Sequence, residues 1–104
     1  MDNQTFANLS EFYTFYLTEH ADVTNRRLHF LGTSCALILL CCFLLTLHWR
    51  YLIFAFVSAY GFAWMGHFIF EKNKPATFQY PLRSFACDWI MYKDIWIGRI
   101  SLKE

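Results

Sequence analysis

Two histidines hold mirror positions around a very short loop, and they are the first sign of a site in this chain. His29 and His67 each lie 19 residues from His48. If the apolar segments on either side of His48 are antiparallel helices, both residues lie about 28 Å from the loop, at about 1.5 Å per residue. Because imidazole binds iron, zinc, copper and nickel, two rings at one level predict a metal site. Each ring could instead form an interhelical hydrogen bond.

Polar residues one helical turn from each histidine could complete such a site. Asn25 precedes His29 by four residues and Glu71 follows His67 by four, so each pair shares a helix face. A histidine and a carboxylate at this spacing can bind a divalent metal. Two histidines with a carboxylate and open positions suit non-haem iron(II) and oxygen. Glu71 could instead pair with a basic side chain at the surface.

A third histidine can reach the same point. Residues 5–19 predict an amphipathic helix, and His20 continues its apolar stripe. In one unbroken helix His20 and His29 would lie on opposite faces, nine positions apart. Residues 21–27 predict a break, which could bring both rings together with His67.

The elements that would position these residues are two apolar runs without a formal charge, residues 28–47 and 51–70. A run of about 20 residues can cross a hydrocarbon layer of roughly 30 Å as a helix. The short connection between them predicts an antiparallel pair. Residues 82–100 predict an aromatic interfacial helix. We therefore expect one domain, 1–104, with an all-α membrane fold: a two-helix transmembrane hairpin with N- and C-terminal amphipathic helices at the cytoplasmic interface.

The distribution of basic residues predicts the orientation of the hairpin. Arg26 and Arg27 precede the first run, and Lys72 and Lys74 follow the second, whereas only Arg50 lies at the other end. Basic residues favour the cytoplasmic side. We expect an integral membrane protein with both termini and the histidine level on the cytoplasmic side.

Composition excludes some function classes. The chain has 104 residues, is 57% hydrophobic and carries a net charge of +1, with no dense basic block. This balance argues against nucleic acid as a partner. The four cysteines form no Cys-x-x-Cys pair, so neither a disulfide framework nor a zinc ribbon is indicated.

The segments that carry the three histidines resemble the signature of a known membrane family. They read Tyr16-Leu-Thr-Glu-His20, Asn25-Arg26-x-x-His29-x-x-Gly32-Thr33 and Trp64-x-x-His67-Phe68-x-Phe70-Glu71-x-Asn73-x-Pro75-Ala76-Thr77-Phe78. The family is that of the fungal 2-hydroxy-fatty-acid alpha-dioxygenase, which makes odd-chain fatty acids from phytosphingosine breakdown. The resemblance covers roughly residues 12–83. In length and C-terminal character the chain is similar to bacterial members, which points to the bacterial cytoplasmic membrane.

The resemblance implies an iron(II)-dependent oxygenase. The ligands that it implies for Fe(2+) are His20, His29 and His67, whereas His48 has no place in the pattern. Asn25, Glu71 and Asn73 match motif positions without an assigned role. The implied substrate is a 2-hydroxy fatty acid, with its tail in the bilayer and its head at the interface, which loses its carboxyl carbon as carbon dioxide.

Location suggests further catalytic candidates. Arg26, Arg27 or Lys74 could neutralise the substrate carboxylate, and arginine is favoured by its bidentate geometry. Glu71 is a further candidate, as a carboxylate at the metal.

Two other functions stay open at this point. The chain could be a non-enzymatic membrane hairpin that forms homo-oligomers or assists a partner in lipid metabolism, with histidines that only join helices. It could also be a zinc-dependent hydrolase of lipid head groups. Imidazole nitrogens that converge on one centre would favour a metal, and rings that point apart would favour the non-enzymatic hairpin.

Overall fold

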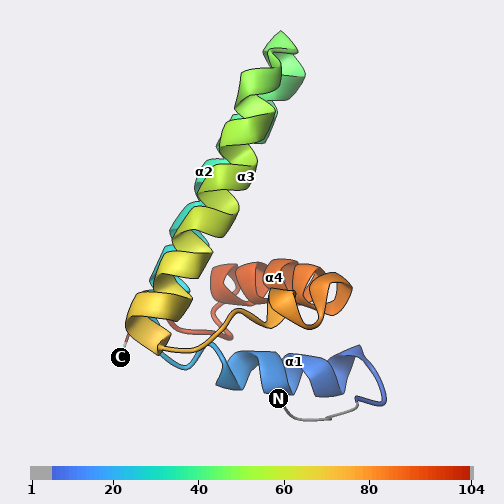
Figure 1. Ribbon diagram of the computed structural model, residues 1–104, viewed down its shortest axis with the longest axis vertical. Coiled ribbons are helices and arrows are strands. Elements are labelled where there is room, and N and C mark those ends of the chain that lie inside the picture. The colour runs from blue at the N-terminus through green and yellow to red at the C-terminus, as the bar shows by residue number, and fades with distance from the viewer. Residues whose placement is uncertain (1–5, 104) are drawn as a thin grey trace.

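The computed structural model describes residues 6–103, which contain helices and no strands (Figure 1). The predicted all-α class is therefore confirmed. The predicted start of the first helix at residue 5 and both ends of the predicted domain lie outside the described residues. The elements in chain order are α1 (Leu9–Thr18), α2 (Val23–Thr46), α3 (Trp49–Met65), the π-helical turn η1 (Gly66–Glu71), the 3-10 turn η2 (Ala76–Phe78) and α4 (Pro81–Trp96).

Helices α2 and α3 form a long antiparallel pair (Figure 1). Leu47 ends α2 in the left-handed conformation, with φ of 59°, and α3 begins two residues later. The predicted connection of residues 48–50 is thus shorter, because Trp49 and Arg50 already belong to α3. The reversal leaves the start of α2 beside the end of α3.

Helix α2 begins at Val23, five residues before the predicted start at residue 28. The side chain of Asp22 accepts a hydrogen bond from the backbone N–H of Asn25, at 3.0 Å, and so caps the helix. The break predicted for residues 21–27 is therefore confined to the few residues between α1 and Val23.

The two long helices pack tightly at Gly32. The hydroxyl of Ser58 donates to the carbonyl oxygen of Gly32 at 3.1 Å. A Cβ atom at position 32 would lie 2.8 Å from the backbone oxygen of Ser58 and 2.9 Å from the Cβ of Phe62. Only glycine fits this contact without a shift, because both neighbouring atoms lie closer than a Cβ contact allows.

Helices α1 and α4 pack together beside the end of the hairpin where α2 begins and η1 ends (Figure 1). We call this end of the molecule the foot. Their buried apolar residues, together with Ala76 of η2, form a core cluster, which consists of Phe12, Tyr16, Ala76, Cys87 and Met91. The cluster joins segments from both halves of the chain, so the foot is a packed unit even though the hairpin rises away from it.

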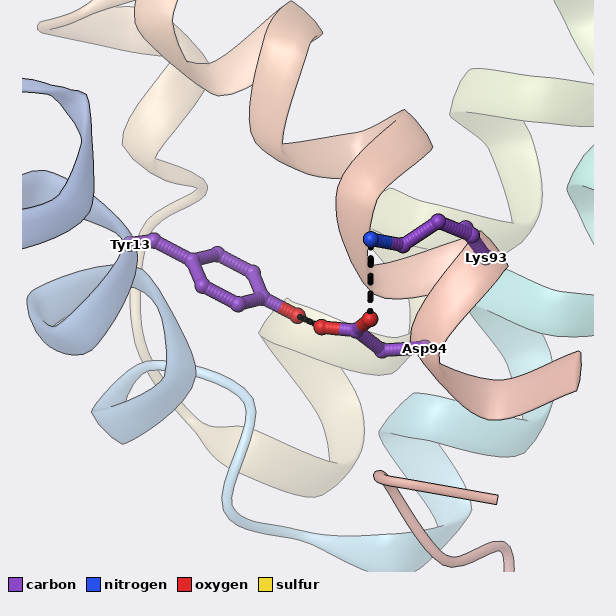
Figure 2. A network of polar contacts seen from close by, with 3 residues as sticks. All are labelled: Tyr13, Lys93 and Asp94. Atoms are coloured by element: carbon purple, nitrogen blue, oxygen red, sulfur yellow. Dashed lines mark hydrogen bonds and ion pairs between the residues drawn. The ribbon is translucent and has the colours of Figure 1, made fainter. Parts of the chain in front are cut away.

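A polar contact at the edge of the foot fastens α1 to α4. The hydroxyl of Tyr13 donates to Asp94 at 2.8 Å, and the ammonium of Lys93 lies 3.3 Å from the other carboxylate oxygen (Figure 2). Burial would raise the pKa of Asp94, but the hydrogen bond from Tyr13 and the charge of Lys93 hold this pKa below its ordinary value. The carboxylate therefore stays charged where it joins the two helices.

Helix α4 also packs against α2 through aromatic rings. The ring of Phe30 lies 5.1 Å from that of Tyr92 and 5.5 Å from that of Trp96, between centroids. The hydroxyls of Tyr92 and Ser34 are 2.8 Å apart. Part of the aromatic side that the sequence predicts to lie at the membrane interface thus faces the hairpin.

The hairpin exposes most of its apolar side chains. Two segments, Val23–Thr46 and Trp49–Glu71, are long and apolar enough to cross a membrane. Of the most apolar window in each, only 11% and 22% of the residues are buried. A core helix of a soluble protein would be mostly buried, so this apolar surface needs another cover.

We expect Gly32→Ala to destabilise the fold by about 1–3 kcal/mol, the usual cost of overpacking a tight contact. The matched control is Gly61→Ala on α3, where an added Cβ meets nothing within 4 Å. That change should be neutral or stabilising by up to about 1 kcal/mol, because alanine has the higher helix propensity. Unfolding in detergent micelles measures both, and equal effects would contradict the close approach at Gly32.

Candidate metal centre

His20 is held by the last turn of α1. Its Nδ1 lies 2.7 Å from the backbone oxygen of Tyr16, which can only accept, so Nδ1 carries the proton. The ring also stacks on that of Tyr16 at 4.0 Å between centroids. Burial, with His67 nearby, lowers the pKa of His20 to about 3. The imidazole is therefore neutral, and its Nε2 presents a lone pair.

His67 is oriented in a comparable way by Asn73. Its Nδ1 lies 2.7 Å from Oδ1 of Asn73. The amide nitrogen of Asn73 donates to the backbone oxygen of Glu19 at 3.2 Å, so its oxygen is the side that faces His67. The Nδ1 of His67 is therefore the donor, so in the neutral ring its Nε2 carries the lone pair.

The backbone around His67 is unusual in two ways. The residue lies in the π-helical turn at the end of α3. Such turns are rare in proteins, but those that occur are often found at functional sites. The turn ends at Lys72, which is left-handed with φ of 61°, and the N–H of Asn73 donates to the backbone oxygen of His67 at 3.0 Å. This reversal places Asn73 against the ring that it orients.

The two Nε2 atoms face one another. They lie 3.0 Å apart, and each belongs to a ring whose Nδ1 proton is already donated elsewhere. Two lone pairs at this distance repel unless a cation lies between them. Metal–nitrogen bonds of about 2.1 Å place two ligands of one ion about 3.0–3.4 Å apart, so the spacing fits a shared metal.

His29 completes the group from α2. Its ring centroid lies 4.6 Å from that of His20 and 5.0 Å from that of His67. Its buried Nε2 has no hydrogen-bond partner among residues 6–103. One nitrogen from each of the three rings lies within 4.8 Å of the other two, and the three residues are at most 8% exposed. An orphaned buried nitrogen beside two converging lone pairs fits a metal ion.

Glu71 lies beside this group rather than in it. Its Oε1 accepts hydrogen bonds from the backbone N–H of Asp22 at 2.9 Å and from the side-chain amide of Asn25 at 3.1 Å. It therefore joins the end of the π-helical turn to the start of α2. Gly66 leaves room for this junction, because a Cβ there would lie 2.0 Å from Oδ1 of Asn25. These contacts give Glu71 a structural role at the junction. Its catalytic role remains a prediction.

The two arginines have different surroundings. A guanidinium nitrogen of Arg26 lies 3.5 Å from the backbone oxygen of His20, and its buried Nε has no hydrogen-bond partner within the described range. The Nε of Arg27 donates to the backbone oxygen of Leu102 at 2.8 Å, in an exposed position. Arg26 is therefore close to the histidines, whereas Arg27 holds the C-terminal segment.

A cavity of about 230 Å³ adjoins the three histidines. Its polar end includes Tyr16 and Asp88, and the hydroxyl of Tyr16 donates to the carboxylate of Asp88. Burial raises the pKa of Asp88 to about 6, although this hydrogen bond acts in the opposite direction. The cavity therefore contains a carboxyl group that changes its charge near neutral pH.

The sequence did not predict the roles of three residues that surround the histidines. Tyr16 lies four residues before His20, a helical spacing that could have suggested contact. Asn73 matches a motif position of the family resemblance, but its hydrogen bond to His67 depends on the left-handed turn at Lys72. Asp88 reaches the site through the packing of α4, which leaves no local signal.

We predict that Asp88→Asn stabilises the protein more at pH 7 than at pH 4. The pKa of Asp88 in the folded protein, about 6, exceeds the ordinary value of 3.8. The protonated carboxyl group is therefore tolerated below pH 3.8, and the fold loses stability as the pH rises through 6 and the buried group becomes charged. The loss is at most about 3 kcal/mol for a shift of this size. Asparagine does not titrate and can still accept from Tyr16. Melting temperatures across this pH range measure the effect.

Asp94→Asn is the control with the opposite sign. The pKa of Asp94 is lowered, so its carboxylate stabilises the fold above the ordinary pKa, and that contribution is lost as the pH falls. This variant should be less stable than the wild type at pH 7 and approach it in acid. A pH-independent difference for Asp88→Asn would contradict the raised pKa.

Comparison with known proteins identifies the family. The chain matches the family model of the 2-hydroxy-palmitic acid dioxygenase Mpo1-like proteins over residues 6–100. Searches of curated proteins and of solved structures give no significant match. The match spans nearly the whole chain and confirms the resemblance drawn from the histidine motifs. The chain therefore belongs to the Mpo1-like family.

Proposed function

We propose that the protein is an iron(II)-dependent membrane dioxygenase that shortens 2-hydroxy fatty acids by one carbon. The family to which the chain belongs carries the description 2-hydroxy-palmitic acid dioxygenase Mpo1-like. This description supports the reaction class. The observation that carries the proposal is the convergence of three buried imidazoles, two of them with Nε2 atoms 3.0 Å apart.

The proposed reaction balances without a further reductant. A 2-hydroxy acid, R–CH(OH)–COOH, and one O₂ give R–COOH, carbon dioxide and water. The bond between the carboxyl carbon and the hydroxyl-bearing carbon breaks, and dioxygen is the oxidant for both carbon products. Iron(II) held by His20, His29 and His67 would supply the open coordination positions and the redox chemistry.

The residues of the chain prepare the site for this chemistry. The backbone oxygen of Tyr16 and the side chain of Asn73 fix the tautomers and orientations of His20 and His67. Such partners usually matter for metal affinity as well as geometry. Arg26 is the arginine that we propose to neutralise the substrate carboxylate, because it borders His20. A role for Arg27 would require it to leave Leu102.

We further propose that α2 and α3, with η1, cross the bacterial cytoplasmic membrane, with both termini on the cytoplasmic side. Their largely unburied apolar surface supports a lipid environment. Arg26, Arg27, Lys72 and Lys74 lie at the foot of the hairpin and Arg50 at its tip, which supports the orientation. Helices α1 and α4 would then lie at the interface, and part of the exposed surface could join copies of the chain.

The alternative of a non-enzymatic hairpin has weaker support. It expects histidines that point apart and bond separately. His20 does bond to a backbone oxygen, but through Nδ1, while its Nε2 faces His67. A zinc-dependent hydrolase would use the same ligands, so metal analysis must accompany the activity assay.

The first test combines metal content with activity. Protein purified without oxygen in detergent should hold about one iron per chain and convert 2-hydroxypalmitate to the acid one carbon shorter. Alanine at His20, His29 or His67 should remove most of the iron and the activity, whereas His48→Ala in the exposed turn should retain both. Full activity in the three variants would end the proposal, and bound zinc with hydrolysis would favour the hydrolase.

The second test addresses the support of His67. Asn73→Ala should weaken iron binding about 10–100-fold, the usual effect of removing a partner of a ligating histidine. Asn73→Asp keeps an acceptor oxygen for the ring N–H and should restore much of the affinity. Iron titration monitored by absorption measures both variants. Equal affinity in the wild type and Asn73→Ala would show that the hydrogen bond does not support the metal.

A further inference from the structure

The cavity continues away from the histidines along the hairpin, and its walls follow one stripe on each helix. On α2 the lining residues are His29, Thr33, Ala36, Leu37 and Leu40. On α3 and η1 they are Leu52, Ala55, Phe56, Ala59, Tyr60, Ala63, Trp64 and His67. Spacings of three and four residues keep each set on one helix face. The two facing stripes therefore form a groove that starts at the candidate metal centre.

The groove changes from polar to apolar along its length. The three histidines and Asp88 lie at the foot, whereas the walls toward the hairpin tip consist of alanine, leucine and phenylalanine. A ligand that matches this order has a polar head and a long apolar tail. We infer that the groove holds the alkyl chain of one 2-hydroxy fatty acid, and that Ala36 and Ala59 determine how long a chain it accepts. This inference rests on the proposed function.

The length of the groove suits a long chain. Leu40 follows His29 by 11 residues, or about 16 Å along the helix. An extended chain advances about 1.2 Å per bond, since the three backbone bonds of a residue span at most ~3.6 Å. The groove therefore has room for about 13 carbons beyond the head, which matches a long-chain rather than a short-chain acid.

Small side chains keep the groove open. Ala36 is seven residues from His29 and Ala59 is eight from His67, so the two lie at a similar level on opposite walls. A larger side chain at either position would fill the space that the middle of an alkyl chain needs. The matched position outside the groove is Val57, which is 62% exposed.

The groove is not sealed from its surroundings. Phe56, Trp64, Phe85 and Trp89 line it, yet each is between 41% and 58% exposed. In a bilayer these side chains would meet lipid, so an acid dissolved in the membrane could enter sideways with its head already at the foot. This favours a single amphipathic acid as the occupant over a water-soluble one.

The experiment is a chain-length series in the full-length protein. Initial rates for 2-hydroxyoctanoate, 2-hydroxydodecanoate and 2-hydroxypalmitate are compared in the wild type, Ala59→Phe, Ala36→Leu and the control Val57→Phe. We expect kcat/KM for 2-hydroxypalmitate to fall about 100-fold in the groove variants, because several methylenes lose their site. The value for 2-hydroxyoctanoate should change less than about threefold, and Val57→Phe should resemble the wild type.

Binding of the same radiolabelled acids separates this inference from the proposed function. A wild type that binds 2-hydroxypalmitate but converts none of the acids would end the proposed function, and the groove would stand if the two variants still discriminate by length. An unchanged length profile in folded, iron-loaded variants would overturn the groove. Equal losses of kcat/KM for acids of every chain length would also overturn it. A change of oligomeric state alone would do the same, because the groove would then be a contact between copies of the chain. Ala36→Leu decides the question if Ala59→Phe does not fold.

Discussion

The main constraint on the structure is the burial of three imidazoles where the hairpin meets its foot. His20 and His67 direct lone pairs at each other across 3.0 Å, and the buried Nε2 of His29 has no hydrogen-bond partner in the described chain. A buried polar atom without a partner costs free energy, and facing lone pairs add repulsion. The packing around them must therefore be strong enough to hold the rings together despite this cost.

That packing comes from contacts between segments that are distant in sequence. Glu71 joins the π-helical turn to the start of α2, while Asn73 joins the same turn to the end of α1. Tyr13 and Tyr16 attach α1 to α4 through Asp94 and Asp88. Each of the three segments that supplies a histidine is thus fastened to another one. The convergence of the three histidines is a property of the junction and not of any single helix.

Sequence reasoning was most successful where fixed helix geometry decides the outcome. The rise per residue is constant, so His29 and His67, equidistant from a short loop, had to lie at one level once the helices paired. It was less successful where long-range contacts decide. The start of α2 moved to Val23 because Asp22 caps it, and the backbone of Asp22 is itself held by Glu71, 49 residues away. Asp88 could not be placed, because its position depends on how α4 packs.

The division between hairpin and foot suits the amphipathic substrate that we propose. The foot has a packed core and a polar network, whereas the hairpin leaves most of its apolar surface uncovered. An acid with a long tail needs both environments, and they meet only at the junction. The histidines lie there, and the groove leads from them into the apolar part. Moving the rings one or two turns toward the tip would surround the reacting head with hydrocarbon, where a carboxylate is costly to place. The position of the histidines along the hairpin is therefore as important for the proposed chemistry as their convergence.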